Sequence, residues 1–203
     1  MNDSRLSEAL KVFEYYTTGL WTEIPARFQS TFRGEVFQEC DLCGKELRQE
    51  GMKYMIGKYY QDGQLKQESC LCFDCRGEIR QGYSKESEQI MGAFFSKEKK
   101  HERLDWASNL KKARLEKMIA ACLQCGRSKE EVGNYFEYGL CVADRFLFYL
   151  HPYLHCEECI GQMVMSLSDQ TNQFRERYYA QYYGLPPSDG LKVERKPLEL
   201  LLF

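Results

Sequence analysis

Four Cys-x-x-Cys pairs constrain the fold of this 203-residue chain more than any other feature of its sequence. The two residues inside each pair let the backbone turn tightly enough for both sulfur atoms to face one point. Two such pairs together offer four sulfur ligands. The eight cysteines are Cys40, Cys43, Cys72, Cys75, Cys122, Cys125, Cys156 and Cys159.

The expected compartment decides whether these cysteines are interpreted as disulfides or as metal ligands. No apolar run approaches the roughly 20 residues of a membrane-spanning helix, and the start, Met1–Arg5, lacks the basic and apolar regions of a secretory signal. We therefore expect a cytoplasmic protein with no membrane contact. In a reducing compartment, this density of cysteines favours metal binding, and disulfides are the alternative.

The second half of the sequence repeats the first. Cys40 and Cys72 are 32 residues apart, and Cys122 and Cys156 are 34 residues apart. Other landmarks repeat at matching distances: a glycine after each first pair, Ser84 and Ser168 nine residues after each second pair, and the aromatic pairs 94–95 and 178–179. So many shared spacings indicate an internal duplication, with repeats at 37–96 and 119–183.

Each repeat predicts a β-hairpin followed by helices. In the first, aromatic and β-branched residues flank an Asp-Gly turn, which predicts strands at 54–60 and 65–71. In the second, 134–142 and 146–154 flank residues 143–145 in the same way. Helical stretches follow at 76–81 and 160–166. Ser84 and Ser168 are predicted to cap the start of a further helix in each repeat.

The remaining chain divides into three segments. Residues 1–36 predict an amphipathic helix and then an irregular stretch. Residues 97–118 predict a charged helical linker, with apolar residues at helical spacing and a net charge of +4 from eight basic and four acidic residues. Residues 184–203 predict a C-terminal tail in which a loop precedes an apolar end.

The pattern resembles the treble-clef zinc finger, on two stretches that with their following helices cover well over half of the chain. These run from Cys40-Asp-Leu-Cys43-Gly44 to Cys72-Phe-Asp-Cys75, and from Cys122-Leu-Gln-Cys125-Gly126 to Cys156-Glu-Glu-Cys159. The resemblance implies an α+β fold of two tandem modules, each with a zinc knuckle, a β-hairpin and a helix whose start supplies the last two ligands. It implies structure more than activity, because this fold group serves many functions.

Two Zn²⁺ ions are the predicted cofactors, each held by the four cysteines of one repeat. Pairing across the repeats and iron–sulfur clusters are the alternatives. A site made of four thiolates leaves no position open for water, which is typical of structural zinc. Cys70 and Cys141 fall outside the pattern and are interpreted as small buried apolar residues, although Cys70 lies close enough to Cys72 to compete as a ligand.

Catalysis is not expected. Treble clefs also form the core of HNH-type nucleases, whose activity requires histidines around the hairpin and helix. This chain has three histidines, His101, His151 and His155, and the first repeat has none of them. We therefore predict a protein that is not an enzyme, with an HNH-like nuclease as a distant alternative.

Interaction with another macromolecule is the predicted role, and the predicted partner is an unidentified protein. Both repeats are acidic, with net charges of −2 and −3. This disfavours nucleic acid, whose affinity for proteins comes largely from neutralised phosphates. The alternative is a regulatory nucleic-acid-binding protein that uses the basic helix at 97–117. The tyrosines at 178–183 could stack on bases, but packing or protein contact is preferred.

Overall fold

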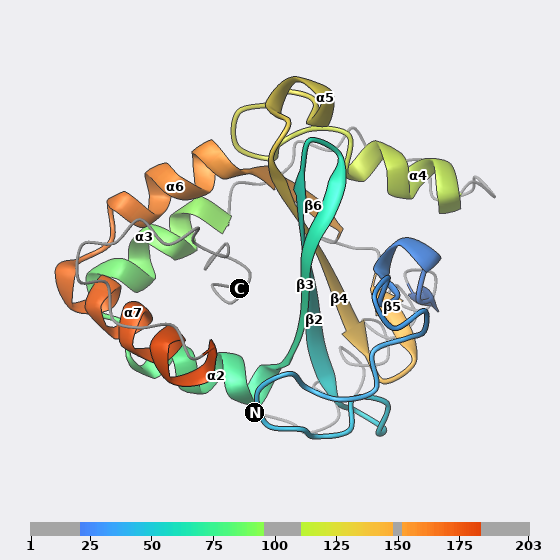
Figure 1. Cartoon of the computed structure of the whole chain (residues 1–203), viewed down its shortest axis with the longest axis horizontal. Coiled ribbons are helices and arrows are strands. Elements are labelled where there is room, and N and C mark those ends of the chain that lie inside the picture. The colour runs from blue at the N-terminus through green and yellow to red at the C-terminus, as the bar shows by residue number, and fades with distance from the viewer. Residues whose placement is uncertain (1–20, 96–110, 148–151, 184–203) are drawn as a thin grey trace, which may run out of the picture.

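The structure is a computed structural model that describes residues 21–95, 111–147 and 152–183 (Figure 1). The predicted N-terminal helix, the linker up to residue 110 and the tail from 184 lie outside these ranges. The described chain is α+β, with one six-stranded antiparallel sheet in the order β1-β5-β4-β2-β3 and with β6 also paired to β4. The strands are β1 (Trp21–Glu23), β2 (Lys53–Gln61), β3 (Gln64–Cys72), β4 (Tyr135–Val142), β5 (Arg145–Leu147) and β6 (Tyr153–Cys156).

Both predicted hairpins are present. In the first, Asp62 and Gly63 adopt φ values of 50° and 74°, which suits a tight turn between β2 and β3. In the second, the returning strand is divided. β5 pairs with the end of β4 and β6 pairs with its beginning, and residues 148–151 between them are not described. The prediction of one strand over 146–154 therefore becomes two short strands on the same side of β4.

The two repeats share this sheet because their first strands pair with each other. β2 lies antiparallel to β4 from Lys53 opposite Val142 to Tyr60 opposite Tyr135. The centre of this pairing, where Gly57 lies opposite Tyr138, relates the two hairpins by an approximate two-fold rotation. No local sequence signal predicts this pairing, since the two strands are about 80 positions apart in the chain.

Helices from both repeats cover one face of the sheet, as Figure 1 shows. In the first repeat the second cysteine pair is followed by α2 (Phe73–Gln81) and α3 (Lys85–Phe95), and in the second by α6 (Glu157–Met165) and α7 (Asp169–Tyr183). α2 and α6 each begin three residues earlier than predicted. The shorter helices η1 (Ala26–Phe28), α4 (Lys111–Met118) and α5 (Lys129–Val132) lie elsewhere around the sheet.

The predicted capping residues Ser84 and Ser168 also join the two repeats. Each hydroxyl accepts a hydrogen bond from the backbone N–H three residues later, at Ser87 and Thr171, as an N-cap does. The two caps meet, with their hydroxyl oxygens 2.8 Å apart. The N–H of Ser84 donates to the Thr171 hydroxyl at 2.9 Å, and the N–H of Ser168 donates to the Ser87 hydroxyl at 3.0 Å. These mutually equivalent bonds show that the approximate two-fold relation extends to the helices.

The opposite face of the sheet carries a buried row of charges. Lys58 lies directly between Glu68 on β3 and Glu137 on β4, and its ammonium is 3.4 Å from the Glu68 carboxylate. Arg27 in η1 donates two hydrogen bonds to Glu137. Glu68 also accepts from the N–H of Thr31 at 2.9 Å. The segment before the first repeat is therefore fastened to the sheet by paired, hydrogen-bonded charges, which is the condition under which charges are tolerated in a core.

Gly139 lies at a crowded point of this face. A Cβ atom at this position would lie 2.6 Å from the Phe146 ring and 2.7 Å from the Phe28 ring. Both rings are fully buried and pack against each other with centroids 4.8 Å apart, so neither has room to move.

We therefore predict that Gly139→Ala lowers the free energy of unfolding by about 1–3 kcal/mol, the usual cost of overpacking. Gly77→Ala is the matched control, because Gly77 lies inside α2 and a Cβ there meets nothing within 4 Å. The control should raise stability by up to about 1 kcal/mol through helix propensity. Urea denaturation measures both, and equal effects of the two substitutions would contradict the packing argument.

Candidate metal centres

The first two cysteines of each cluster lie in a tight turn. In the first repeat the N–H of Gly44 donates to the Cys40 carbonyl at 2.9 Å, and in the second the N–H of Gly126 donates to the Cys122 carbonyl at 2.8 Å. Both glycines have positive φ values, 68° and 76°, which side chains other than glycine rarely adopt. The glycine after each first pair is therefore required by the turn that aims the two sulfur atoms.

The other two cysteines of each cluster come from the start of a helix. Cys72 ends β3 and is the N-cap of α2, and Cys75 lies in the first turn of that helix. Cys156 and Cys159 hold the same places at the start of α6. The N–H groups of Cys72 and Cys156 point at the sulfur atoms of Cys40 and Cys122, at 3.4 and 3.3 Å. Free N–H groups at a helix start stabilise negative charge on sulfur.

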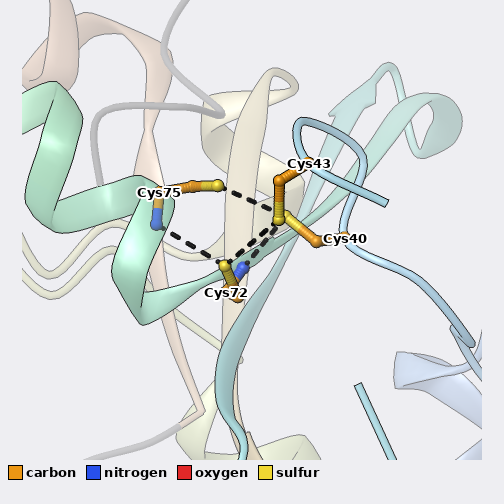
Figure 2. Close-up of side chains that lie close together, drawn as sticks. All are labelled: Cys40, Cys43, Cys72 and Cys75. Atoms are coloured by element: carbon orange, nitrogen blue, oxygen red, sulfur yellow. Dashed lines mark hydrogen bonds between the residues drawn. The ribbon is translucent and has the colours of Figure 1, made fainter. Parts of the chain in front are cut away.

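Figure 2 shows the four sulfur atoms of the first cluster converging on one point. In each cluster all four lie within 4.8 Å of one another. The separations of Cys40 from Cys75, Cys43 from Cys72 and Cys125 from Cys156 are each 3.8 Å. A tetrahedral ion with zinc–sulfur bonds of about 2.3 Å separates its ligands by about 3.8 Å. Both clusters therefore have the dimensions of a site that could hold a metal ion.

Each cluster belongs to one repeat, which excludes pairing of ligands across the repeats in this structure. Cys72 lies opposite Tyr54 near the start of β2, and Cys156 lies opposite Tyr135 at the start of β4. Because β2 and β4 are antiparallel, the clusters lie at opposite ends of that strand pair. Six residues of strand separate those ends by about 20 Å.

A cationic side chain lies over each cluster and is held by an acidic residue from the first turn of the helix. In the first repeat Lys45 donates to Asp74 at 2.7 Å. In the second, Arg127 pairs with Glu158 and also donates to the sulfur of Cys125 at 3.5 Å. These two pairs occupy equivalent positions in the repeats. Alignment of the repeats would have revealed them, although the cysteine spacing alone does not.

These surroundings shift the pKa values of the cluster thiols in different directions. Burial alone would raise the pKa of Cys125, but hydrogen bonds from Arg127 lower it to about 6. By contrast, burial and the neighbouring sulfur atoms raise the pKa of Cys75 and of Cys159. Four thiols in such close contact do not all ionise without a compensating positive charge. A metal cation supplies that charge, so the donor set fits one.

The two remaining cysteines lie in the core outside both clusters, as predicted. Cys70 and Cys141 are fully buried, and burial raises the pKa of both thiols. Neither lies in the sulfur clusters at the ends of the sheet. Cys70 therefore does not compete with Cys72 as a ligand in this structure.

The histidine within the described residues lies in the core. His155 is fully buried and its ring packs against Phe94, Phe95 and Tyr153 at centroid distances of 4.9, 5.4 and 5.2 Å. His101 and His151 lie outside the described ranges. The first repeat has Leu71 at the place of His155, so this position is an apolar packing site in both repeats.

The predicted basic helix is described only from Lys111. In that part, α4, the apolar residues Leu115 and Met118 are buried, while Glu116 and Lys117 are exposed. Of the tyrosines at 178–183, Tyr178 packs against Phe174 with ring centroids 5.8 Å apart. Within the described ranges, no helix is long and apolar enough to cross a membrane.

Comparison of the chain with protein-family models, with curated proteins and with solved structures finds no match. The fold and the clusters define the class of this chain: an α+β protein with two four-cysteine clusters consistent with zinc-binding modules.

We predict that Arg127→Gln weakens metal retention at the second cluster by about 10- to 100-fold, the usual cost of losing a residue that supports metal ligands. Without the guanidinium the pKa of Cys125 rises, so its thiolate is protonated and the metal released at a higher pH. Competition with a chelator between pH 5 and pH 8 measures the release.

Arg127→Lys is the conservative control, because Lys45 holds the equivalent place in the first repeat. It should restore most of the retention. Release from the first cluster should stay unchanged in both variants. If the two clusters lose metal in parallel, Arg127 does not act locally on the Cys125 site.

Proposed function

We propose that this chain is a zinc-binding protein in which each repeat is a treble-clef-like module built around one structural Zn²⁺. The observation that carries the proposal is the matching geometry of the two clusters, with sulfur atoms 3.8 Å apart in both. The order of turn, hairpin and helix around each cluster supports it. The ligands are then the eight cysteines of the four pairs, and all four positions of each ion are filled by sulfur, which leaves no place for a reacting water.

Zinc in such a site stabilises the fold rather than performing chemistry. Each ion fastens the turn before the hairpin to the start of the helix that follows it. Without a metal, each cluster would bring together thiols whose pKa values shift in opposite directions, since the pKa of Cys125 is lowered and that of Cys159 is raised. Structural zinc contributes folding free energy on the order of 10 kcal/mol per site.

The proposed role is non-enzymatic binding of a protein partner in the cytoplasm. Three large apolar side chains are exposed on the described surface, namely Phe32, Phe73 and Met165 at 65%, 40% and 78%. The acidic repeats disfavour nucleic acid as the partner. Burial of His155 among aromatic rings gives it no access to a substrate, which weighs against an HNH-like nuclease.

We predict two zinc ions per chain by elemental analysis of protein purified without added metal. Cys43→Ser and Cys125→Ser should each reduce the content to one, since those cysteines belong to different clusters. A strong chelator should unfold the protein, as monitored by circular dichroism, and added Zn²⁺ should refold it.

Cys141→Ser is the control for loss of a buried thiol outside the clusters, and it should keep both ions. If the purified protein contains iron and absorbs visible light, the clusters hold iron–sulfur centres and not zinc. A folded chain without any metal would refute the proposal.

Retention on duplex or single-stranded DNA at low salt would favour the nucleic-acid alternative over a protein partner. DNA cleavage that depends on metal and is lost in His151→Ala would overturn the non-enzymatic assignment.

A further inference from the structure

Each four-cysteine cluster has one ligand that is exposed to solvent. Cys43 in the first cluster and Cys125 in the second are exposed, and they hold equivalent places in the two repeats. The other ligands are buried, apart from the half-buried Cys159. A reagent that arrives from solvent therefore meets Cys43 or Cys125 first, and the surroundings of these two residues can be compared directly.

The sulfur of Cys125 is covered by a cationic donor. The Arg127 guanidinium donates from Nε to this sulfur at 3.5 Å, and one of its Nη atoms lies 3.9 Å from the sulfur of Cys156. The fork of N–H groups that arginine presents allows one side chain to contact both sulfur atoms and also to pair with Glu158.

The sulfur of Cys43 lacks this cover. Lys45 holds the place equivalent to Arg127, but its ammonium donates to the Asp74 carboxylate at 2.7 Å. Within the described ranges, no N–H group donates a hydrogen bond to the Cys43 sulfur, which lies 3.8 Å from the sulfur of Cys72. The two clusters therefore have the same ligands in the same geometry, and they differ in the protection of their exposed sulfur.

This difference affects the reactivity of the two sulfur atoms when both clusters hold zinc. A cysteine that binds a metal ion is deprotonated, so the fraction of thiolate is the same at Cys43 and at Cys125. The nucleophilicity of each sulfur then decides which one reacts. A thiolate that shares its lone pairs with a cationic donor is the weaker nucleophile. The Arg127 guanidinium therefore protects Cys125, whereas Cys43 is an exposed and unprotected thiolate.

We propose that Cys43 is an oxidation site for hydroperoxides, and that its oxidation removes the metal from the first cluster while the second cluster keeps its ion. The inference rests on the zinc-binding function proposed above. It adds that one of the two modules responds to oxidants and the other does not.

The reaction takes place in two steps. The Cys43 thiolate attacks one oxygen of the peroxide, the O–O bond breaks and hydroxide leaves, so that Cys43 becomes a sulfenic acid. The Cys72 thiolate, 3.8 Å away, then attacks the Cys43 sulfur, a disulfide bond forms and a second hydroxide leaves. The two hydroxides take up two protons from solvent. The two thiolates thus lose two electrons in total, and hydrogen peroxide is reduced to two molecules of water.

The disulfide removes two of the four ligands of the first cluster. Cys40 and Cys75 remain, and they provide only half of the tetrahedral ligand set that zinc favours. Cys72 is also the N-cap of α2, so the disulfide still joins the turn to the start of the helix after the metal has left. Reduction of the disulfide returns all four ligands.

Limited oxidation of the full-length, zinc-loaded protein by hydrogen peroxide tests this assignment. A chromogenic chelator follows the released zinc, and tandem mass spectrometry of proteolytic fragments locates the disulfide. The wild type should release the first of its two ions at least about tenfold faster than the second. A Cys43–Cys72 disulfide should form at the same rate as the first release. Dithiothreitol and added Zn²⁺ should then restore two ions per chain.

Exchange of the two cationic residues tests the protection by the guanidinium. Lys45→Arg should slow release from the first cluster about tenfold, and Arg127→Lys should speed release from the second by a similar factor. Lys85→Arg, at an exposed lysine of α3 outside both clusters, is the matched control and should change neither rate. Two zinc ions before peroxide is added show that the clusters of each variant are intact.

Alkylation provides a second measurement that needs no substitution. A limiting amount of iodoacetamide transfers its carbamidomethyl group to the most reactive sulfur, and iodide leaves. Cys43 should carry this group before any other cysteine, and the buried Cys70 and Cys141 should stay unmodified. The order of alkylation in the wild type decides the question if Lys45→Arg or Arg127→Lys fails to bind two ions.

Equal rates of release of the two ions from the wild type overturn the proposal, and so does oxidation or alkylation of Cys125 before Cys43. Unchanged rates in Lys45→Arg and Arg127→Lys, with two ions bound, also overturn it. Failure of the zinc-binding function has a different signature, because it appears as a wild type without zinc before any peroxide is added. A wild type that binds two ions and loses them together refutes the oxidation site alone.

Discussion

The antiparallel pairing of β2 with β4 is the contact on which the rest of this structure depends. It converts two separate hairpins into one sheet, and it places the four-cysteine clusters at opposite ends of the central strand pair. It also sets the helices of both repeats on the same face, where the caps Ser84 and Ser168 meet. A shift of this register by one residue would exchange the two faces of β4 and separate the buried Glu137 carboxylate from Arg27.

The clusters add a second constraint that acts locally. Each ties a tight turn, the end of a strand and the start of a helix to a single point, so that α2 and α6 leave the sheet at fixed places. The ion pairs of Lys45 with Asp74 and of Arg127 with Glu158 also join the turn to the start of the helix, in addition to the sulfur atoms. The sheet therefore fixes the relation between the repeats, while the clusters fix the relation between sheet and helices.

Short-range features of this chain were predictable from its sequence and long-range ones were not. Cysteine spacing predicted the membership of both clusters, the Asp62–Gly63 turn predicted the first hairpin, and Ser84 and Ser168 were correctly predicted as caps. Each of these depends on residues close in the sequence. The β2–β4 pairing left no local signal. Burial of Lys58, Glu137 and Arg175 was also missed, since charged residues are usually exposed and only tertiary contacts show otherwise.

The approximate two-fold relation has a consequence for how such a protein can change. Two identical modules joined through the same strand edge would form a symmetric dimer, in which every substitution appears twice and both halves of a shared surface change together. A single chain that carries both copies removes this restriction. The first repeat has Arg76 where the second has the buried Ile160, and the second has Arg175 where the first has the buried Met91. Covalent linkage of the copies thus lets equivalent positions carry different side chains within one common architecture.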